Sequence, residues 1–224
     1  MAGEALLYDL QHSPACAKVR ICLQVKGVPY RRIAPSVREL LRDVPVPRLV
    51  LDGRPAIRAD LIVRQLDVLW PTPALVPVEA DLRAYSDLLE GWADAALGAA
   101  VRRLAWGPEP ARARMARAMA REVTKGPLAR MVAAVLARRA AALACTAAEA
   151  RDALKDHVRV LEMMLGDRPF LLGRAPTRAD FAAVAQLACV RRVAEDLSFE
   201  SWPAVSAWLD RLDDMPAVGT ALSA

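Results

Sequence analysis

The sequence predicts a mixed fold, in which an α/β unit with the element order β-α-β-α-β-β-α precedes an all-α helical bundle. The first seventy residues alternate short strand-like runs with short helical ones, whereas from about residue 78 onward the apolar residues recur with helical spacing. Between the two parts, the proline-rich stretch "WPTPALVPVEA" cannot continue a helix. We therefore expect an α/β domain over residues 1–71, a linker over 72–78 and a helical domain over 79–224.

The α/β unit is expected to begin with the strand "ALLYDL" and a helix over residues 14–26. Ser13 followed by Pro14 is typical of a helix start, and Gly27 tolerates the left-handed conformation that often follows a helix end. "PYRRI" then reads as a second strand. Because this strand follows a crossover helix, it should pair in parallel with the first strand through a right-handed connection.

The second half of this unit contains a strong hairpin signal. "VRELLRD" predicts a short helix, and "PRLVLDGRPAIRA" predicts two antiparallel strands joined by a tight turn at Asp52-Gly53. Asp60 is expected to cap a third helix that ends at Leu69, since aspartate is among the best N-terminal caps.

The helical part is expected to contain five helices, over residues 79–105, 111–140, 147–165, 177–192 and 202–213. Two of them start with capping boxes, "TAAE" at 146–149 and "TRAD" at 177–180, which place a hydroxyl three residues before a carboxylate. Both boxes are expected to be structural.

Length and composition are those of a globular protein. The chain has 224 residues, of which 55% are hydrophobic, and no run approaches the ~20 apolar residues of a membrane span. "MAGEALLYDL" lacks the regions of a signal peptide, so we expect a cytoplasmic protein with no membrane partner. The cysteines fit neither metal-ligand spacing nor a disulfide framework, and no metal is expected; they are Cys16, Cys22, Cys145 and Cys189.

The net charge of +5 is concentrated between residues 112 and 139. This segment contains eight basic residues and a single acidic residue, Glu122. Arg114, Arg117 and Arg121 are spaced to share one helix face. This segment is either a solvated face or a functional patch for an anionic partner. Nucleic acid is not the expected partner, because no nucleic-acid motif or interleaved aromatic residue accompanies the charge.

Three stretches resemble the cytosolic glutathione transferase family, and the likeness covers nearly the whole chain. "SPACAKVRICLQVKGVPY" is similar to the first helix and second strand of that family, "VPRLVLDGRPAIRAD" to its Val-Pro turn and hairpin, and "LLGRAPTRADFAAVAQL" to its buried C-terminal helix. The resemblance implies a thioredoxin-like N-terminal domain, glutathione as cosubstrate, a small electrophilic substrate and a homodimer.

Several site residues follow from this resemblance. Val46 and Pro47 match the turn whose peptide bond is commonly cis and whose backbone pairs with glutathione. Asp60 and Leu61 match the positions that hold the γ-glutamyl end. Because Leu61 stands where the family usually has serine, one charge-assisted hydrogen bond is missing, which makes glutathione binding uncertain. Asp60 is either a contact of the γ-glutamyl amine or a plain cap.

Ser13 also has two interpretations, which are compatible. As a cap it stabilises the helix by about 1 kcal/mol. As a catalytic residue, matched to the serine of serine-type transferases, its hydroxyl would donate to the sulfur of glutathione where helix amides favour a thiolate. In "SPAC", Cys16 is the remaining position of a glutaredoxin-like motif and is expected to be either a buried apolar residue or an acidified thiol.

The electrophile is expected to bind along the first long helices of the bundle. The candidate pocket residues are His12, Tyr85, Trp92, Arg102 and Trp106, although aromatic residues at helical spacing also occur in cores and interfaces. We assign no nucleophile to His12 and therefore expect no catalytic role for it.

The sequence thus favours a transferase-like enzyme that activates a thiol at a helix N-terminus for addition to, or isomerisation of, an electrophile. The alternative is a protein of the same fold that has lost glutathione and acts in binding or as a scaffold. A weaker third hypothesis is a protein that binds an anionic partner through the basic segment.

Overall fold

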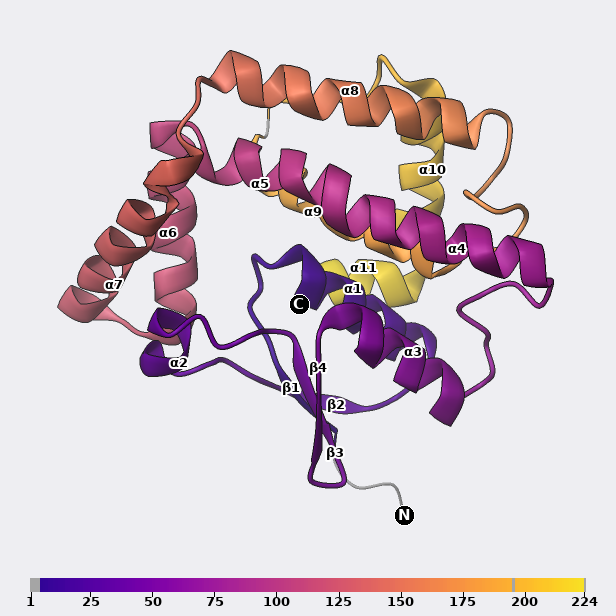
Figure 1. Cartoon of the computed structure of the whole chain (residues 1–224), viewed down its shortest axis with the longest axis horizontal. Coiled ribbons are helices and arrows are strands. Elements are labelled where there is room, and N and C mark those ends of the chain that lie inside the picture. Colours follow the sequence, from indigo (N-terminus) through magenta and orange to yellow (C-terminus); the bar gives the residue numbers. More distant parts are fainter. Residues whose placement is uncertain (1–4, 195, 224) are drawn as a thin grey trace.

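A computed structural model describes residues 5–194 and 196–223, in which a small sheet lies at one end of a larger helical part (Figure 1). The sheet has the strand order β2-β1-β3-β4. β1 pairs in parallel with β2 and antiparallel with β3, and β3 pairs antiparallel with β4. The strands are β1 (Ala5–Tyr8), β2 (Tyr30–Ile33), β3 (Arg48–Leu51) and β4 (Arg54–Ile57). The predicted order of elements along the chain, the parallel β1–β2 pair and the antiparallel β3–β4 hairpin are confirmed.

Three helices belong to the α/β part. They are α1 (Pro14–Val25), α2 (Val37–Leu41) and α3 (Ala59–Leu69). Ser13 is the N-cap of α1, and Asp52 and Gly53 both have positive φ, as a tight hairpin turn requires. The prediction that Asp60 caps α3 is wrong. Arg58, with φ of 72°, already occupies the cap position, so Asp60 lies inside the first turn.

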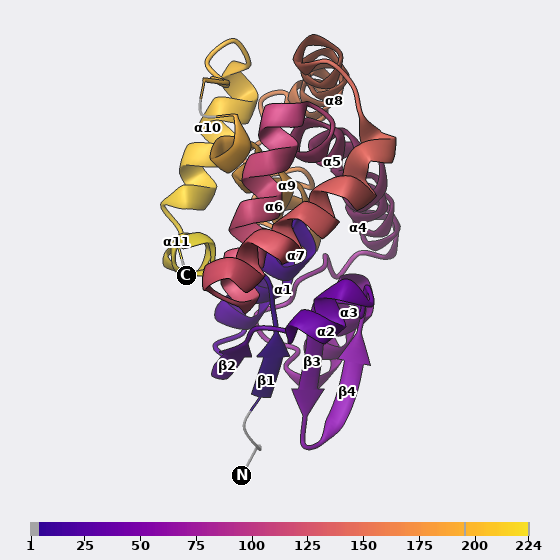
Figure 2. The ribbon, with the colours of Figure 1, turned by 90° about the vertical axis from the view of Figure 1, so that its left-hand side faces the viewer.

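The helical part follows a stretch without helix or strand over residues 70–79 (Figure 2). Its elements are α4 (Ala80–Trp92), the π-helical turn η1 (Ala93–Leu97), α5 (Gly98–Trp106), α6 (Glu109–Val123), α7 (Gly126–Arg139), the 3-10 turn η2 (Ala140–Leu143), α8 (Ala147–Leu165), α9 (Arg178–Val193), α10 (Pro203–Asp213) and α11 (Pro216–Ser223). The prediction did not include α11.

The helix expected over residues 111–140 is two helices. The chain leaves α6 at Thr124 with an extended conformation and turns at Gly126, whose φ is 64°. Pro127 then stands in the first turn of α7, where its missing N–H costs nothing. The Gly-Pro pair is therefore the physical reason for the break, and α6 and α7 lie side by side in both ribbon views (Figures 1 and 2).

The first long helix is continuous from α4 to α5 but contains the wider turn η1. A π-turn absorbs about one extra residue compared with an α-turn, and each residue of an α-helix corresponds to about 100° of rotation. The π-turn therefore rotates the side chains before residue 93 relative to those after residue 97. In an unbroken α-helix the two sets would have a different relative orientation.

The core is centred on α9, which is buried along nearly all its length and packs against α1, α4 and α5. α1 packs against α9, α3 and α11, so the helix that Ser13 caps lies between the two parts of the molecule. Among the described residues, no single helix is long and apolar enough to cross a membrane. The segments 126–143 and 147–165 reach that length and apolarity only as a pair, bent by 70°.

Candidate functional site

A cavity of about 650 Å³ opens beside the start of α1. Residues 12–15 form one wall, and η1, α5, α6 and α9 supply the others. Four of the residues predicted for the site line this cavity and are thus brought together: His12, Ser13, Arg102 and Trp106. Apolar side chains, among them Met115 and Met119 of α6, complete the wall.

Ser13 is both the cap of α1 and a wall residue of the cavity. Its hydroxyl oxygen accepts a long hydrogen bond of 3.4 Å from the N–H of Cys16, and Pro14 follows it in the first turn. The first turn of α1 contains no acidic residue. The unpaired amides and the dipole of α1 therefore produce a positive potential where Ser13 meets the cavity.

Cys16 is a buried thiol that packs beneath Ser13. Its side chain is fully buried, and its sulfur accepts a 3.5 Å hydrogen bond from the N–H of Leu10. Burial, reinforced by Asp9, raises the pKa of the Cys16 thiol to about 12 in spite of the nearby Ser13 hydroxyl. Of the two interpretations of Cys16, the structure supports the buried apolar residue.

The loop before Ser13 is held by a carboxylate from the helical part. Glu122 of α6 accepts hydrogen bonds from the N–H of Gln11 at 2.5 Å and from the N–H of His12 at 3.3 Å, and it lies 2.5 Å from Nδ1 of His12. Sequence analysis missed this role. The one available signal was that Glu122 is the only acid in a strongly basic segment.

Tyr85 and Trp92, two of the predicted pocket residues, do not line this cavity. Tyr85 is 57% exposed and borders a different hollow, near residues 164–173. Trp92 packs edge-on against His157 of α8, with ring centroids 6.0 Å apart. Tyr85 lies nine residues, or about 13 Å along the helix, before Asp94, the first residue of this helix in the cavity wall. Trp92 is close to Asp94 in sequence, but the π-turn η1 changes its direction relative to Arg102 and Trp106.

Val46 and Pro47 lie at the turn before β3. Their peptide bond is cis, as predicted, and Val46 is half-buried against the small apolar cluster that also contacts Trp106. Within the described part of the chain, the N–H of Val46 has no hydrogen-bond acceptor. Neither Val46 nor Pro47 is among the residues that line the cavity.

Asp60 and Leu61 begin α3 but do not line the cavity. Both carboxylate oxygens of Asp60 accept from Arg58, at 3.2 and 2.9 Å. Partial burial acts to raise the pKa of Asp60, but the hydrogen bonds and charge of Arg58 outweigh it and lower the pKa. Leu61 is 47% exposed and offers no polar group. The carboxylate of Asp60 is thus already partnered within its own loop.

A buried ion network joins α1 to the long helix behind the cavity. Nζ of Lys18, which is fully buried, lies 3.0 Å from Glu90 and 2.5 Å from Asp94, and Asp94 also lines the cavity. Burial alone lowers the pKa of Lys18, but Asp94 and Glu90 outweigh it and raise the pKa. Arg178 of α9 forms a further ion pair with Glu90 at 3.0 Å. The network fixes the position of α1 against η1.

Comparisons with known proteins identify the family. The glutathione S-transferase N-terminal domain matches residues 7–74, and the glutathione S-transferase C-terminal domain matches residues 127–216. A maleylpyruvate isomerase of Ralstonia sp is 34% identical over 34% of this chain and 41% of that protein. A probable glutathione S-transferase of Oryza sativa subsp. japonica is 28% identical over 42% of this chain and 45% of that protein.

The chain thus spans less than half the length of these two relatives. A solved glutathione S-transferase from Methylobacterium radiotolerans, in complex with glutathione sulfonate, shares the fold. It has a TM-score of 0.71 and 21% identity, over 98% of this chain and 95% of that chain. With both family domains matched over more than half of its residues, the chain belongs to the glutathione S-transferase family.

Proposed function

We propose that the protein is a glutathione-dependent transferase or isomerase that activates the cosubstrate's thiol at the start of α1. The observation that carries this proposal is the position of Ser13, which combines a hydroxyl, an acid-free helix N-terminus and a cavity wall. A sulfur placed there would be favoured as a thiolate, because the helix amides and the hydroxyl stabilise an anion more than a neutral thiol.

Two features support glutathione as the cosubstrate: the Ser13 wall for its thiol end and, outside the residues that line the cavity, the Val46-Pro47 turn for its middle. The free N–H of Val46 offers the backbone donor that an extended peptide requires. The fit is poorer at the γ-glutamyl end, where Leu61 is apolar and Asp60 is partnered by Arg58. When bound, glutathione would supply the nucleophilic sulfur, and the protein would orient it and exclude water.

Glu122 and His12 act as positioning residues in this proposal. The carboxylate of Glu122 holds two successive amides of the loop that leads into Ser13. Fixing this loop fixes the Ser13 hydroxyl relative to the cavity, and small displacements of catalytic groups are costly.

The electrophile side combines an apolar wall with one cation. Arg102 and Trp106 line the cavity together with Met115 and Met119. The carboxylate of Asp94 also lines it but is paired with Lys18, so an electrophile with an apolar body and a carboxylate fits best. The relative from Ralstonia carries the name maleylpyruvate isomerase, which agrees with an isomerase activity.

The alternative function is a binding or scaffold protein without glutathione. The apolar Leu61 and the Arg58–Asp60 pair favour it. The two functions differ in what glutathione does to the folded state, since a ligand of the native protein must raise its stability.

We also propose a homodimer that works in the cytoplasm. Large apolar side chains are exposed at the end of α3, just before α4 and along α4, and the pair Arg64–Asp87 joins these two helices. The exposed residues are Val68, Leu69, Val78, Tyr85 and Leu88. Such a patch is typical of a contact surface. A mass of 24.3 kDa by light scattering at micromolar concentration would contradict the dimer.

The decisive experiment is a calorimetric titration with glutathione, combined with a thiol-transfer assay on Ser13 variants. Ser13→Asp keeps a good cap but places a carboxylate beside the thiolate, whereas Ser13→Ala removes both cap and donor. Both variants should lose about ten- to a thousandfold of the activity, while Ser13→Asp keeps the unfolding free energy within about 1 kcal/mol.

Two results would contradict the enzyme. The absence of both binding heat and thermal protection at millimolar glutathione would favour the scaffold function. Full activity of Ser13→Asp would mean that Ser13 is only a cap.

A further inference from the structure

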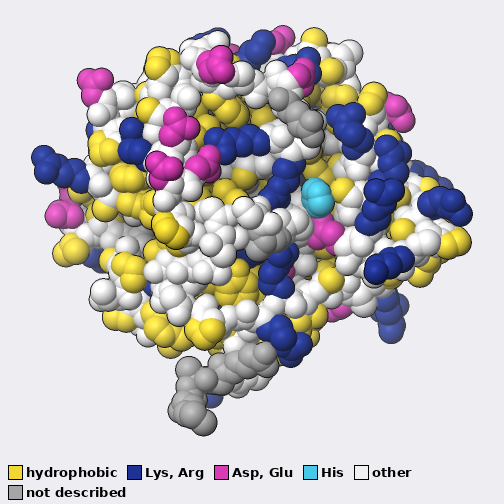
Figure 3. Space-filling view, turned by 180° about the vertical axis from the view of Figure 1, so that it is seen from behind, with side chains coloured by type: hydrophobic (Ala, Val, Ile, Leu, Met, Phe, Trp, Pro, Cys, Tyr) yellow, Lys and Arg dark blue, Asp and Glu magenta, His cyan; other side chains and the backbone are white. Residues whose placement is uncertain are grey.

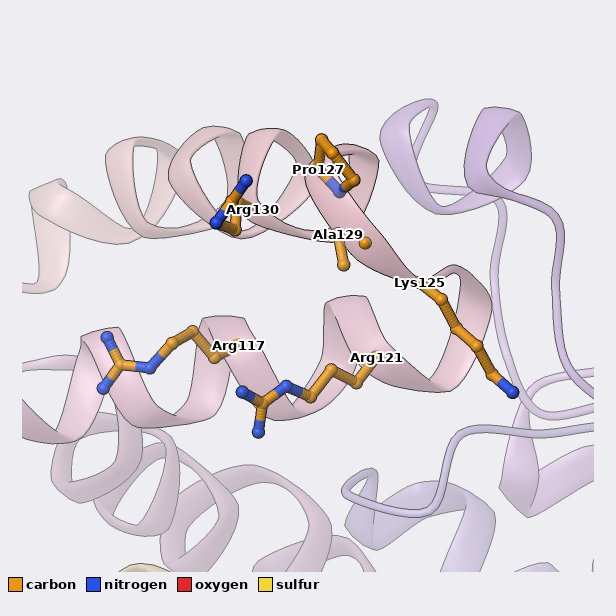
Figure 4. Close-up of a pocket in the computed structure, with 7 residues that line it drawn as sticks. Arg117, Arg121, Lys125, Pro127, Ala129 and Arg130 are labelled. Carbon is orange, nitrogen blue, oxygen red and sulfur yellow. The ribbon is translucent and has the colours of Figure 1, made fainter.

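A second hollow, separate from the Ser13 cavity, lies between α6 and α7 and has a volume of about 540 Å³. Figure 4 shows Arg117 and Arg121 on α6 and Arg130 on the facing helix α7, with Lys125 on the connecting turn. Gly126, Pro127 and Ala129 complete the lining. Within the described ranges, no Asp or Glu lines this groove, which we call the arginine groove.

The charges of the arginine groove have no partners. Arg117, Arg121, Lys125 and Arg130 form no ion pair or hydrogen bond with any residue that the structure describes. Elsewhere on the surface, many arginines are paired with carboxylates; examples are Arg48–Glu39, Arg58–Asp60, Arg139–Asp43, Arg151–Asp196, Arg159–Asp156 and Arg191–Asp213. Others, such as Arg54 and Arg138, also have no partner among the described residues, but the groove is distinguished by having four unpaired cations around one hollow. Basic side chains gather on the side of the molecule where α6 and α7 lie (Figure 3).

The like charges that line the arginine groove repel one another. Arg117 and Arg121 are four residues apart on one helix, where like charges are mildly destabilising. The turn at Gly126 brings Arg130 of α7 to the same hollow, which adds a third like charge. The one acid in this segment, Glu122, is occupied on the opposite side by the loop before Ser13. The groove therefore has cations from two helices and no internal counter-charge.

We propose that the arginine groove is a binding site for a small polyanion of the di- or triphosphate class. Three guanidinium groups suit phosphate, because each can donate two parallel hydrogen bonds to phosphate oxygens. The volume lies within the range of small-ligand sites. A ligand with several charges is favoured over a single carboxylate, since a single charge would leave the remaining cations uncompensated. A nucleic-acid strand is disfavoured, because no aromatic side chain lines the groove for base stacking.

The test is calorimetry with inorganic tripolyphosphate, without glutathione, on the native protein and two double variants. Arg117→Gln/Arg121→Gln removes two groove charges. Arg54→Gln/Arg138→Gln removes two exposed charges outside the groove and is the matched control. We expect saturable binding that weakens with salt, a loss of about tenfold or more in the groove variant, and a change below about twofold in the control.

Two outcomes would overturn the proposal. One is an equal loss in both double variants, which would show that only net charge matters, and the other is no saturable binding at millimolar tripolyphosphate. Binding to phosphatidylinositol bisphosphate vesicles without binding to soluble tripolyphosphate would also overturn it, in favour of a lipid surface. Circular dichroism melts confirm that the variants are folded, and a glutathione titration reports separately on the Ser13 cavity.

Discussion

The helices α1 and α9 both begin with a hydroxyl cap, but the two helix starts have different roles. At α9 the buried carboxylate of Asp180 accepts hydrogen bonds from the N–H of Thr177 at 2.8 Å, from Leu171 at 2.9 Å and from the indole of Trp208 at 2.9 Å. At α1 the hydroxyl of Ser13 accepts one long bond, no acid follows in the first turn, and Ser13, Pro14 and Ala15 line a cavity.

The difference teaches that a saturated helix start is structural, whereas an unsaturated one beside a cavity leaves hydrogen-bonding capacity for a ligand. The two helices pack against each other, so both starts belong to one core. The difference between the two helix starts therefore depends on a few residues at each start, and single substitutions can remove it.

The largest effect is expected for Asp180→Ala. The substitution leaves four buried donors without this acceptor, two from Thr177 and one each from Leu171 and Trp208, and an unsatisfied donor costs about 1–3 kcal/mol, so the free energy of unfolding should fall by about 3 kcal/mol or more. Urea unfolding measures it. Glu149→Ala, in the exposed capping box of α8, is the control and should cost several times less. Equal losses would remove the distinction between buried and exposed boxes.

A smaller effect, and on activity, is expected for Glu122→Ala. Removing the carboxylate frees the loop that leads into Ser13, so kcat/KM with glutathione should fall about tenfold. Glu109→Gln, on the same helix but away from the loop, should leave activity unchanged. Native activity in Glu122→Ala would mean that the loop holds its position without this contact.

Leu61→Ser tests a third helix start, that of α3, where a polar group is missing. The new hydroxyl would be one added hydrogen-bond donor to a bound carboxylate, and it should tighten glutathione binding by up to about tenfold in calorimetry. Leu128→Ser, at a site of similar exposure in α7, is the control: Leu61 is 47% exposed and Leu128 is 42% exposed. An unchanged affinity would indicate that another group already holds the γ-glutamyl carboxylate.

The smallest effect concerns the exposed capping box of α2. Hydrogen bonds from Arg48 and Ser36 lower the pKa of Glu39 from 4.5 to about 2. A carboxylate with a lowered pKa adds stability above its ordinary value, and this stability is lost as pH falls through the lowered value. The stability difference between native protein and Glu39→Gln should therefore shrink between pH 4.5 and about 2 in acid-dependent unfolding. A constant difference would contradict this.

Much of the fold was predictable because its signals are local. The Asp52-Gly53 turn, the Ser13-Pro14 start and the boxes at residues 146 and 177 each depend on a few adjacent residues, and all are present. The break at Gly126-Pro127 carried an equally local signal that the sequence analysis missed. The burial of Asp180 was not predictable, because it depends on Trp208, which is distant in sequence.

The candidate site was only partly predictable for the same reason. Ser13 and the Val46-Pro47 turn follow from short motifs, whereas Glu122 reaches the loop across more than a hundred residues. Tyr85 is too far along the helix to reach the cavity, and the position of Trp92 depends on a π-turn, which has no clear signature in one sequence.

The π-helical turn η1 also matters when sequences of different length are aligned. Deleting one residue within Ala93–Leu97 would restore a regular α-helix and rotate the preceding segment by about 100° relative to the following one. Glu90 would then move out of reach of Lys18. In a homologue one residue shorter at this point, an acid that takes the place of Glu90 beside Asp94 and the buried lysine would therefore occupy a neighbouring alignment column. The placement of a single gap decides whether the ion pair looks preserved or lost.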